Sequence, residues 1–217
     1  MTALFIGVYG ASGFGKEVMP LVRQQFPTLN KDNFVFIDDG QAGAISNDYA
    51  VLGYAEFLSK PGVHKAVTIA IANSQIREKL VKRLTEDHVQ HLDIQAANTV
   101  ILDEVEIGEG SLLCPFTCLT SNIKIGKFFH ANIYSYVAHD CVIGDYVTFA
   151  PGVKCNGNIH IQDHAYIGTG AVIKQGTPDK PLVIGKGAII GMGAVVTKSV
   201  PAGVTVVGNP ARILEKK

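Results

Sequence analysis

An apolar residue at every sixth position is the feature that most constrains the fold. An α-helix repeats its face about every 3.6 residues and an ordinary strand every second residue, so neither produces a period of six. Such a period predicts a short strand and a corner in each repeat. The thirteen consecutive apolar positions are Ile101, Ile107, Leu113, Leu119, Ile125, Ala131, Val137, Ile143, Phe149, Cys155, Ile161, Ile167 and Ile173.

Ile-Gly pairs at Ile107, Ile125 and Ile143 recur every eighteen residues, which is three hexapeptides. This spacing predicts one triangular coil per eighteen residues, with the aliphatic residue pointing inward and stacked coils sharing one apolar column. The phase breaks across residues 175–181, a polar stretch with two prolines, and resumes at Ile184. We expect this stretch to be a loop that leaves one coil.

The first ninety residues follow a different pattern. Apolar runs predict strands at residues 4–9, 34–37 and 67–72, and amphipathic segments predict helices at 16–25 and 74–87. Strands that alternate with helices form a parallel sheet. The sequence therefore predicts an α/β Rossmann-like domain over residues 1–92, followed over 93–217 by a parallel β-helix of hexapeptide repeats with a C-terminal tail.

Charge and cysteine content exclude several classes. Nineteen basic residues balance nineteen acidic ones, which argues against nucleic-acid binding. The apolar opening segment is too short to cross a bilayer and lacks a basic flank, so we expect a cytoplasmic protein without membrane insertion. The four cysteines show no CxxC spacing and are expected to be buried or half-buried thiols rather than zinc ligands or disulfides. They are Cys114, Cys118, Cys141 and Cys155.

A glycine-rich turn connects the first predicted strand to the first helix. Backbone N–H groups and the helix dipole at such a turn hold phosphate groups. Glu17 stands where a nucleotide-hydrolysing P-loop needs a hydroxyl, which disfavours that class. Asp38, Asp39 and Asn73 end the next two strands at the same sheet edge. A nucleotide pocket is predicted there, the alternatives being a glycine turn without ligand and solvated turns. The turn residues are Gly10, Ser12, Gly13, Phe14, Gly15 and Lys16.

His139 and Asp140 are the candidate catalytic pair. They lie between the inward residues Val137 and Ile143, so the imidazole is expected on the outer surface near a corner. A carboxylate beside an imidazole fixes its tautomer and favours general-base chemistry, provided that the chain bends between the two residues. Gly157 lies one coil further and would leave space for a thioester beside an N–H donor. The alternative is an ordinary surface pair.

Five motifs together resemble the bacterial sugar O/N-acetyltransferases related to sialic-acid O-acetyltransferases and UDP-4-amino-sugar N-acetyltransferases. The resemblance implies a left-handed β-helix, a homotrimer with active sites between subunits, acetyl-CoA in the groove between neighbouring β-helices, a nucleotide sugar held by the N-terminal domain, and no metal. The motifs are the glycine turn 10–16, residues 36–39, residues 69–73, the block 139–145 and the end 207–212.

By this resemblance His139 is the base, Asp140 its acidic neighbour and Gly157 a backbone donor near the thioester. Thr148, Thr169 and Met192 are expected to contact the coenzyme, and Phe14 occupies a place that is often His in relatives. The implied activity is acetyl transfer from acetyl-CoA to a nucleotide-linked 4-amino-4,6-dideoxy sugar, UDP-linked first and dTDP-linked next, in surface polysaccharide or glycan biosynthesis.

Three alternatives remain open. One is a sialic-acid-type O-acetyltransferase. Another is a zinc hydratase or lyase on the same solenoid, with His160, His164 and His139 as metal ligands. The third is a nucleotide-sugar-binding protein without catalysis. A covalent acyl-enzyme on Cys141 or Cys155 is disfavoured, because Cys155 belongs to the inward column.

Overall fold

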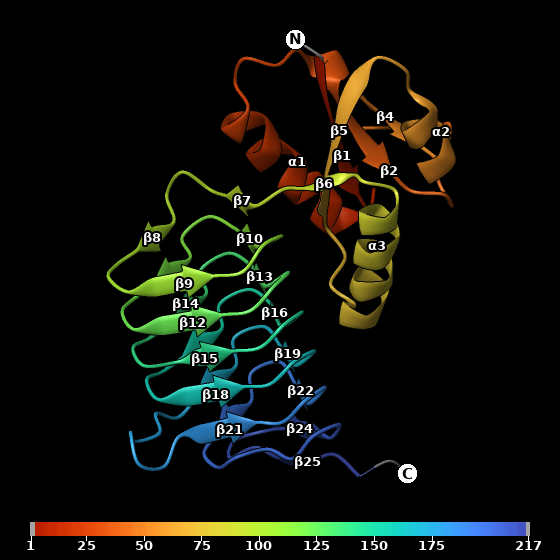
Figure 1. The fold of residues 1–217 in the computed structure, drawn as a ribbon. Helices are drawn as coiled ribbons and strands as arrows, with labels where there is room; N and C mark the ends of the chain where they lie inside the picture. The colour runs from red at the N-terminus through yellow and green to blue at the C-terminus, as the bar shows by residue number, and fades with distance from the viewer. Residues whose placement is uncertain (1–2, 216–217) are drawn as a thin grey trace. The chain divides into compact units, whose positions relative to one another are not determined.

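The computed structural model describes residues 3–215. The chain divides between Ile94 and Gln95 into two compact units (Figure 1). The first is an α/β unit and the second is a left-handed parallel β-helix.

The α/β unit contains a six-stranded sheet that is mainly parallel. Strand β1 lies at its centre and pairs in parallel with β2 and β5, and only the edge pair of β3 and β4 is antiparallel. The central strands are apolar and buried because elements cover both faces of the sheet. In sheet order the strands are β3 (Ile45–Ser46), β4 (Tyr49–Leu52), β2 (Phe34–Ile37), β1 (Ala3–Tyr9), β5 (Val63–Ile69) and β6 (Gln90–His91).

Its helices are α1 (Gly13–Gln25), the 3-10 helix η1 (Lys31–Asn33), α2 (Tyr54–Ser59) and α3 (Ser74–Glu86). Helix α1 begins three residues earlier than the hydrophobic pattern predicts, since the glycine turn itself supplies its first turn. The short elements β3, β4, η1, α2 and β6 were not predicted.

The third predicted strand was placed too late in the sequence. Strand β5 ends at Ile69, whereas the apolar run continues to Ala72. The buried Arg77 explains the difference, because its Nη1 donates to the carbonyls of Ile71 at 2.7 Å and Ala72 at 3.2 Å. These carbonyls therefore bond to a side chain and not to a neighbouring strand.

The β-helix consists of three parallel sheets, one for each side of a triangular coil (Figure 1). The first sheet contains β7 (Ile94–Gln95), β10 (Leu112–Leu113), β13 (His130–Ala131), β16 (Thr148–Phe149), β19 (Tyr166–Ile167), β22 (Ile189–Ile190), β24 (Thr205–Val207) and the antiparallel β25 (Arg212–Ile213). The second contains β8 (Val100–Ile101), β11 (Cys118–Leu119), β14 (Tyr136–Val137), β17 (Lys154–Cys155), β20 (Val172–Ile173) and β23 (Val195–Val196). The third contains β9 (Val105–Ile107), β12 (Ile123–Ile125), β15 (Val142–Ile143), β18 (Ile159–Ile161) and β21 (Leu182–Ile184).

The predicted apolar column is confirmed. Every one of its thirteen residues is the last residue of a strand, and those from Leu113 to Ile173 are buried in one continuous core. Neighbouring coils pair in a register of eighteen, as in Ile125 with Ile143. A second inward position, two residues earlier in each repeat, was not predicted. Cys141, Val147 and Val153 occupy it and are buried.

The loop that leaves one coil is also confirmed. Ile159 pairs with Leu182, a separation of twenty-three residues instead of eighteen. The five extra residues form a turn in which Thr177 and Lys180 bond to each other through their backbones. A Cβ at Gly176 would overlap the carbonyl of Asn158, so glycine is required where the chain departs.

The thiols lie as expected. Cys114, Cys141 and Cys155 are buried and Cys118 is half-buried, all without a disulfide. Across residues 3–215, no helix combines the length and apolar character needed to cross a membrane.

Candidate functional site

The strongest candidate site lies at one corner of the β-helix, where the second sheet leads into the third. We call it the His139 corner; it comprises residues 138–141, 156–158, 174–181 and 197–199. Asp140 has a left-handed backbone with φ of 58°. This bend brings two adjacent side chains to the same side, so His139 Nδ1 lies 2.7 Å from Asp140 Oδ2. Both side chains are about half exposed, at 48% and 46%.

Asp140 has a second partner one coil earlier. Asn122 Nδ2 donates to Asp140 Oδ1 at 3.2 Å. The hydrogen bonds from His139 and Asn122 hold the pKa of the Asp140 carboxyl below its ordinary value, although partial desolvation opposes them. The carboxylate therefore stays ionised and keeps the imidazole oriented. Asn122 was not predicted, although its separation of eighteen residues from Asp140 is a signal that could have found it.

Gly157 lies directly against the imidazole. A Cβ at this position would lie 2.5 Å from His139 Cε1 and 2.5 Å from Nε2, so only glycine leaves the ring in place. Within residues 3–215 the Gly157 N–H donates to no acceptor. The structure thus brings His139, Asp140 and Gly157 together at this corner.

The expected coenzyme residues are not at this corner. Thr169 and Met192 occupy equivalent places in successive coils, at the corner between the first and second sheets, and both are exposed. Thr148 lies in β16 and is only 5% exposed, so its side chain offers a ligand little contact area. Within one chain, therefore, Thr169 and Met192 do not converge with His139.

The two thiols next to this corner, Cys141 and Cys155, are buried. Cys141 is 1% exposed and its Sγ donates to the carbonyl of Asn156 at 3.1 Å. A hydrogen bond from Cys155 lowers the pKa of Cys141, and the same bond together with burial raises the pKa of Cys155. Since both sulfurs face the core, the geometry favours direct transfer over an acyl-cysteine.

The α/β unit brings together the glycine turn and one predicted acid. Gly10 has a φ of 107°, which favours glycine, and a Cβ at Gly15 would overlap the carbonyl of Gly10. The backbone N–H of Ala11 lies 3.3 Å from Asp38 Oδ2. Beside it, Ser12, Gly13 and Lys16 are exposed and Phe14 is half-buried at the start of α1.

The other two predicted polar residues have structural partners. Asp39 Oδ1 accepts from the Tyr54 N–H at 2.7 Å, at the first residue of α2. Asn73 caps α3, because its Oδ1 accepts from the Ile76 N–H at 3.0 Å. Arg83, which was not predicted, lies 4.0 Å from Asp39 and stacks over the Tyr54 ring. Burial, with nearby Asp39, raises the pKa of Tyr9 in the same cluster.

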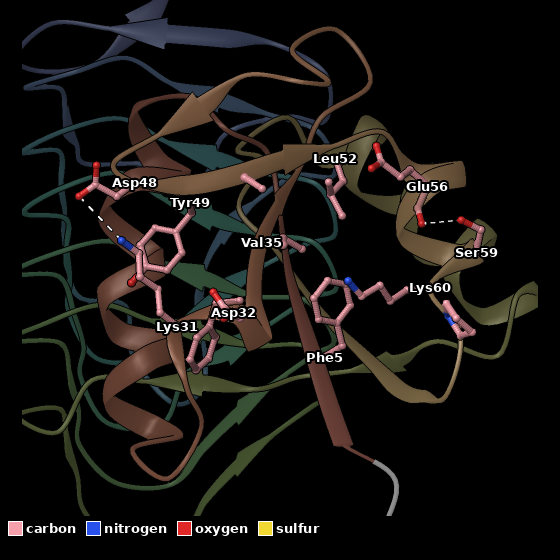
Figure 2. Close-up of a pocket in the computed structure, with 13 residues that line it drawn as sticks. Phe5, Lys31, Asp32, Val35, Asp48, Tyr49, Leu52, Glu56, Ser59 and Lys60 are labelled. Atoms are coloured by element: carbon pink, nitrogen blue, oxygen red, sulfur yellow. Dashed lines mark hydrogen bonds and ion pairs between the residues drawn. The ribbon is translucent and has the colours of Figure 1, made fainter.

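A separate surface depression of about 570 Å³ lies elsewhere in this unit (Figure 2). Its lining includes Phe5 near the start of β1, whereas the glycine turn follows the end of β1. Lys31 lies over the Tyr49 ring and pairs with Asp48, and Lys60 lies over Phe5. None of the predicted nucleotide residues lines it, and ligands of parallel sheets bind at the carboxyl ends of the strands.

The histidines proposed as zinc ligands do not meet within one chain. His160 lies in the third sheet, His164 stacks on Tyr146 at the following corner, and His139 lies at the preceding corner. Among the residues from 3 to 215, no three His, Cys, Asp or Glu side chains cluster as metal ligands.

Comparisons with known proteins agree with this architecture. Residues 6–84 match the PglD N-terminal domain family. GDP-perosamine N-acetyltransferase of Escherichia coli O157:H7 is 52% identical over 97% of this chain and 96% of its own length.

Solved structures show the same two-part fold. WeeI from Acinetobacter baumannii AYE is 83% identical, with a TM-score of 0.97 over 98% of this chain and 100% of its own. The acetyltransferase domain of PglB from Neisseria gonorrhoeae FA1090, in complex with acetyl coenzyme A, is 27% identical, with a TM-score of 0.83 over 98% and 100% of the two chains.

The full-length similarity, the β-helix and the PglD-type first domain lead to one conclusion. The chain belongs to the family of acetyl-CoA-dependent, hexapeptide-repeat sugar N-acetyltransferases that includes GDP-perosamine N-acetyltransferase.

Proposed function

We propose that this protein acetylates the 4-amino group of a UDP-linked 4-amino-4,6-dideoxyhexose during glycan or surface polysaccharide biosynthesis, with His139 as general base. The observation that carries the proposal is the corner where Asp140 orients His139 and Gly157 leaves its Nε2 edge open. The motif resemblance to UDP-4-amino-sugar N-acetyltransferases supports the choice of nucleotide.

The chemistry follows from the corner. With Nδ1–H donating to Asp140, Nε2 carries the lone pair that accepts a proton. The neutral sugar amine attacks the acetyl carbonyl while Nε2 takes its proton, and the Gly157 N–H stabilises the developing oxyanion. The C–S bond then breaks, and coenzyme A leaves as the thiol after receiving a proton from His139. The product is an amide.

The nucleotide part of the acceptor is proposed to bind at the glycine turn of the α/β unit. Backbone N–H groups at the start of α1 suit a diphosphate, and the exposed Lys16 adds a positive charge. Asp38 is the acid nearest the glycine turn, since its Oδ2 accepts from the Ala11 N–H. Its carboxylate also accepts from the Gly40 N–H and from Gln41 Nε2, so a ribose or base would share this acceptor with them.

A homotrimer would explain why the coenzyme residues lie apart. Thr169 and Met192 occupy one corner of the β-helix and His139 another. A coenzyme held between two copies would contact the corner with Thr169 and Met192 in one copy and the His139 corner in its neighbour. Sedimentation equilibrium tests this proposal, since a monomeric but fully active enzyme would contradict it.

A second candidate substrate is the corresponding GDP-linked sugar. It is favoured by the relative at 52% identity, a GDP-perosamine N-acetyltransferase. The UDP-linked and GDP-linked candidates differ in the nucleotide base and in the hexose. One panel of nucleotide-linked amino sugars therefore distinguishes them.

The test is the release of free thiol from acetyl-CoA with UDP-, GDP- and dTDP-linked 4-amino sugars and with sialic acid. Rapid release with the UDP-linked sugar, lost in His139→Ala, supports the proposal. Release with the GDP-linked sugar alone would replace UDP by GDP, and release with sialic acid alone would make the enzyme an O-acetyltransferase.

A further inference from the structure

A basic pocket lies on the His139 corner, in its last two coils. This cavity of about 600 Å³ is formed by residues 174–177, 180–182 and 197–199. Lys174, Lys180 and Lys198 contribute to its lining, and no acidic residue among the described ones does. The five-residue excursion supplies one wall, since it carries Lys180.

The three ammonium groups have no counter-charge. Within residues 3–215, none of them forms an ion pair or hydrogen bond. By contrast, three other lysines of the β-helix each pair with a carboxylate, and these are Lys124, Lys127 and Lys186. Three uncompensated cations around one cavity repel one another and create a positive potential, which an anion would relieve.

The pocket walls are fixed by hydrogen bonds. Ser199 Oγ accepts from the Val183 N–H at 3.0 Å, and Thr177 Oγ1 accepts from the Lys180 N–H at 3.2 Å. Gly176, whose N–H donates to the Gly157 carbonyl at 3.0 Å, ties the start of the excursion to the coil that faces His139. The lysines therefore project from an ordered frame.

The distance from His139 matches the length of one reactant. His139, Gly157, Gln175 and Lys198 occupy equivalent places in four successive coils, because Val137, Cys155, Ile173 and Val196 pair in register. Three coil spacings of about 4.8 Å place Lys198 about 14 Å from His139 along the helix axis. The arm of acetyl-CoA has about thirteen bonds from sulfur to the first phosphorus. It spans about 15 Å when extended, if three bonds cover about 3.5 Å as in a peptide.

We infer that Lys174, Lys180 and Lys198 bind the phosphate groups of coenzyme A, its diphosphate and its 3′-phosphate, while the thioester lies at His139. The inference rests on the proposed function, since acetyl-CoA is the donor in that reaction. It gives the excursion a role: Lys180 makes the site selective for the phosphorylated coenzyme over shorter thioesters.

The nucleotide sugar also carries a diphosphate, so the test must separate the two reactants. We would compare the wild type with a triple variant, Lys174→Gln, Lys180→Gln and Lys198→Gln. The matched control replaces Lys124, Lys127 and Lys186 by Gln, which removes the same charge from the same unit. Each is assayed with acetyl-CoA, with acetyl-dephospho-CoA, with S-acetyl-pantetheine, and with the nucleotide sugar varied at saturating donor.

We expect the triple variant to raise the KM for acetyl-CoA about 30-fold, roughly threefold for each lysine, with kcat nearly unchanged. The KM for S-acetyl-pantetheine and for the nucleotide sugar should stay the same, and the control should match the wild type. Equal increases for acetyl-CoA and S-acetyl-pantetheine, or an increase for the nucleotide sugar alone, would overturn the inference.

Failure of the proposed function is recognisable separately. If the wild type acetylates no nucleotide sugar, calorimetric titration with coenzyme A still tests the lysines. A loss of about 30-fold in affinity in the triple variant supports the phosphate site, and equal affinities in the two proteins refute it.

Discussion

The two units of this molecule position their polar groups in different ways. In the β-helix, the contacts that build the site join residues eighteen apart, such as Asn122 with Asp140 and His139 with Gly157. In the α/β unit they join residues at irregular separations, such as Ala11 with Asp38 and Asp39 with Tyr54. A solenoid converts sequence spacing directly into spatial proximity, whereas an open sheet does so only through its strand order.

The units also differ in their tolerance of change. The β-helix accepts five extra residues at one corner while the next coil returns to register. The glycine turn has no comparable freedom, since a side chain at Gly15 would overlap the chain five residues earlier. Four predictions test this contrast, in order of decreasing effect.

The largest effect is expected from His139→Ala at the corner of the β-helix. Removal of the proposed general base should lower kcat by about 10²–10⁴-fold and leave the affinity for both substrates nearly unchanged. Steady-state thiol release measures the first quantity and calorimetry the second. A kcat within tenfold of the wild type would mean that no base is needed at this corner.

A smaller loss is expected from Gly157→Ala. The new Cβ would displace the imidazole, so kcat should fall by about 10–100-fold, within the range of losing an oriented base. Gly157 does not have a left-handed backbone, so the free energy of unfolding should change by less than about 0.5 kcal/mol. Ser121→Ala, at the equivalent place one coil earlier, is the matched control. Normal kcat in Gly157→Ala would show that the ring can move without cost.

In the α/β unit, Gly15→Ala should destabilise the protein. The added methyl group would overlap the Gly10 carbonyl and force backbone shifts, which cost about 1–3 kcal/mol. At Gly13 a Cβ meets no atom within 4 Å, so Gly13→Ala should change stability by less than about 0.5 kcal/mol. Urea denaturation compares the two variants. Equal stabilities would show that the turn is as adaptable as the β-helix corner.

The smallest effect is expected from Asn122→Ala, which removes one of the bonds that lower the pKa of Asp140. Because that pKa is depressed, the carboxylate persists as the pH falls. In the variant the pKa of Asp140 should rise, and a titration of its carboxyl followed by NMR measures this directly. At pH 7 the charge is unchanged and kcat should fall only about two- to fivefold, or about 0.4–1 kcal/mol, because the lost hydrogen bond is exposed and acts on His139 only through Asp140. Asn122→Asp should raise the pKa of Asp140 further, because it places a second carboxylate beside the first, and an unchanged pKa in both variants would exclude a role for Asn122.

The sequence predicted the β-helix in detail because its evidence is local and repeated. The column from Ile101 to Ile173, the coil of eighteen residues and the excursion are all confirmed. The register also allows Gly157 to be placed beside His139 without a structure. Each coil repeats the same strands and corners. A wrong register in the prediction for one coil would therefore expose an apolar side chain to water.

Prediction was weaker in the α/β unit for a physical reason. Apolar runs identified the central strands, but Asp38, Asp39 and Asn73 look alike in the sequence, since each follows a buried strand. In the structure Asp38 bonds to the glycine turn, whereas Asp39 and Asn73 bond to the N-termini of helices α2 and α3. That choice depends on where α2 and α3 begin, which no local pattern specifies.

The sequence by itself therefore determined the architecture, the pairing of His139 with Asp140 and the glycine stacked beside them, since periodic burial and a fixed register are properties of the chain. Only the tertiary structure decided which corner each residue occupies, that Asn122 bonds to Asp140, and that three lysines far apart in sequence line one cavity. Hydrogen-bond partners and electrostatic potential depend on distances through space, and an excursion such as residues 177–181 changes those distances without changing the repeat.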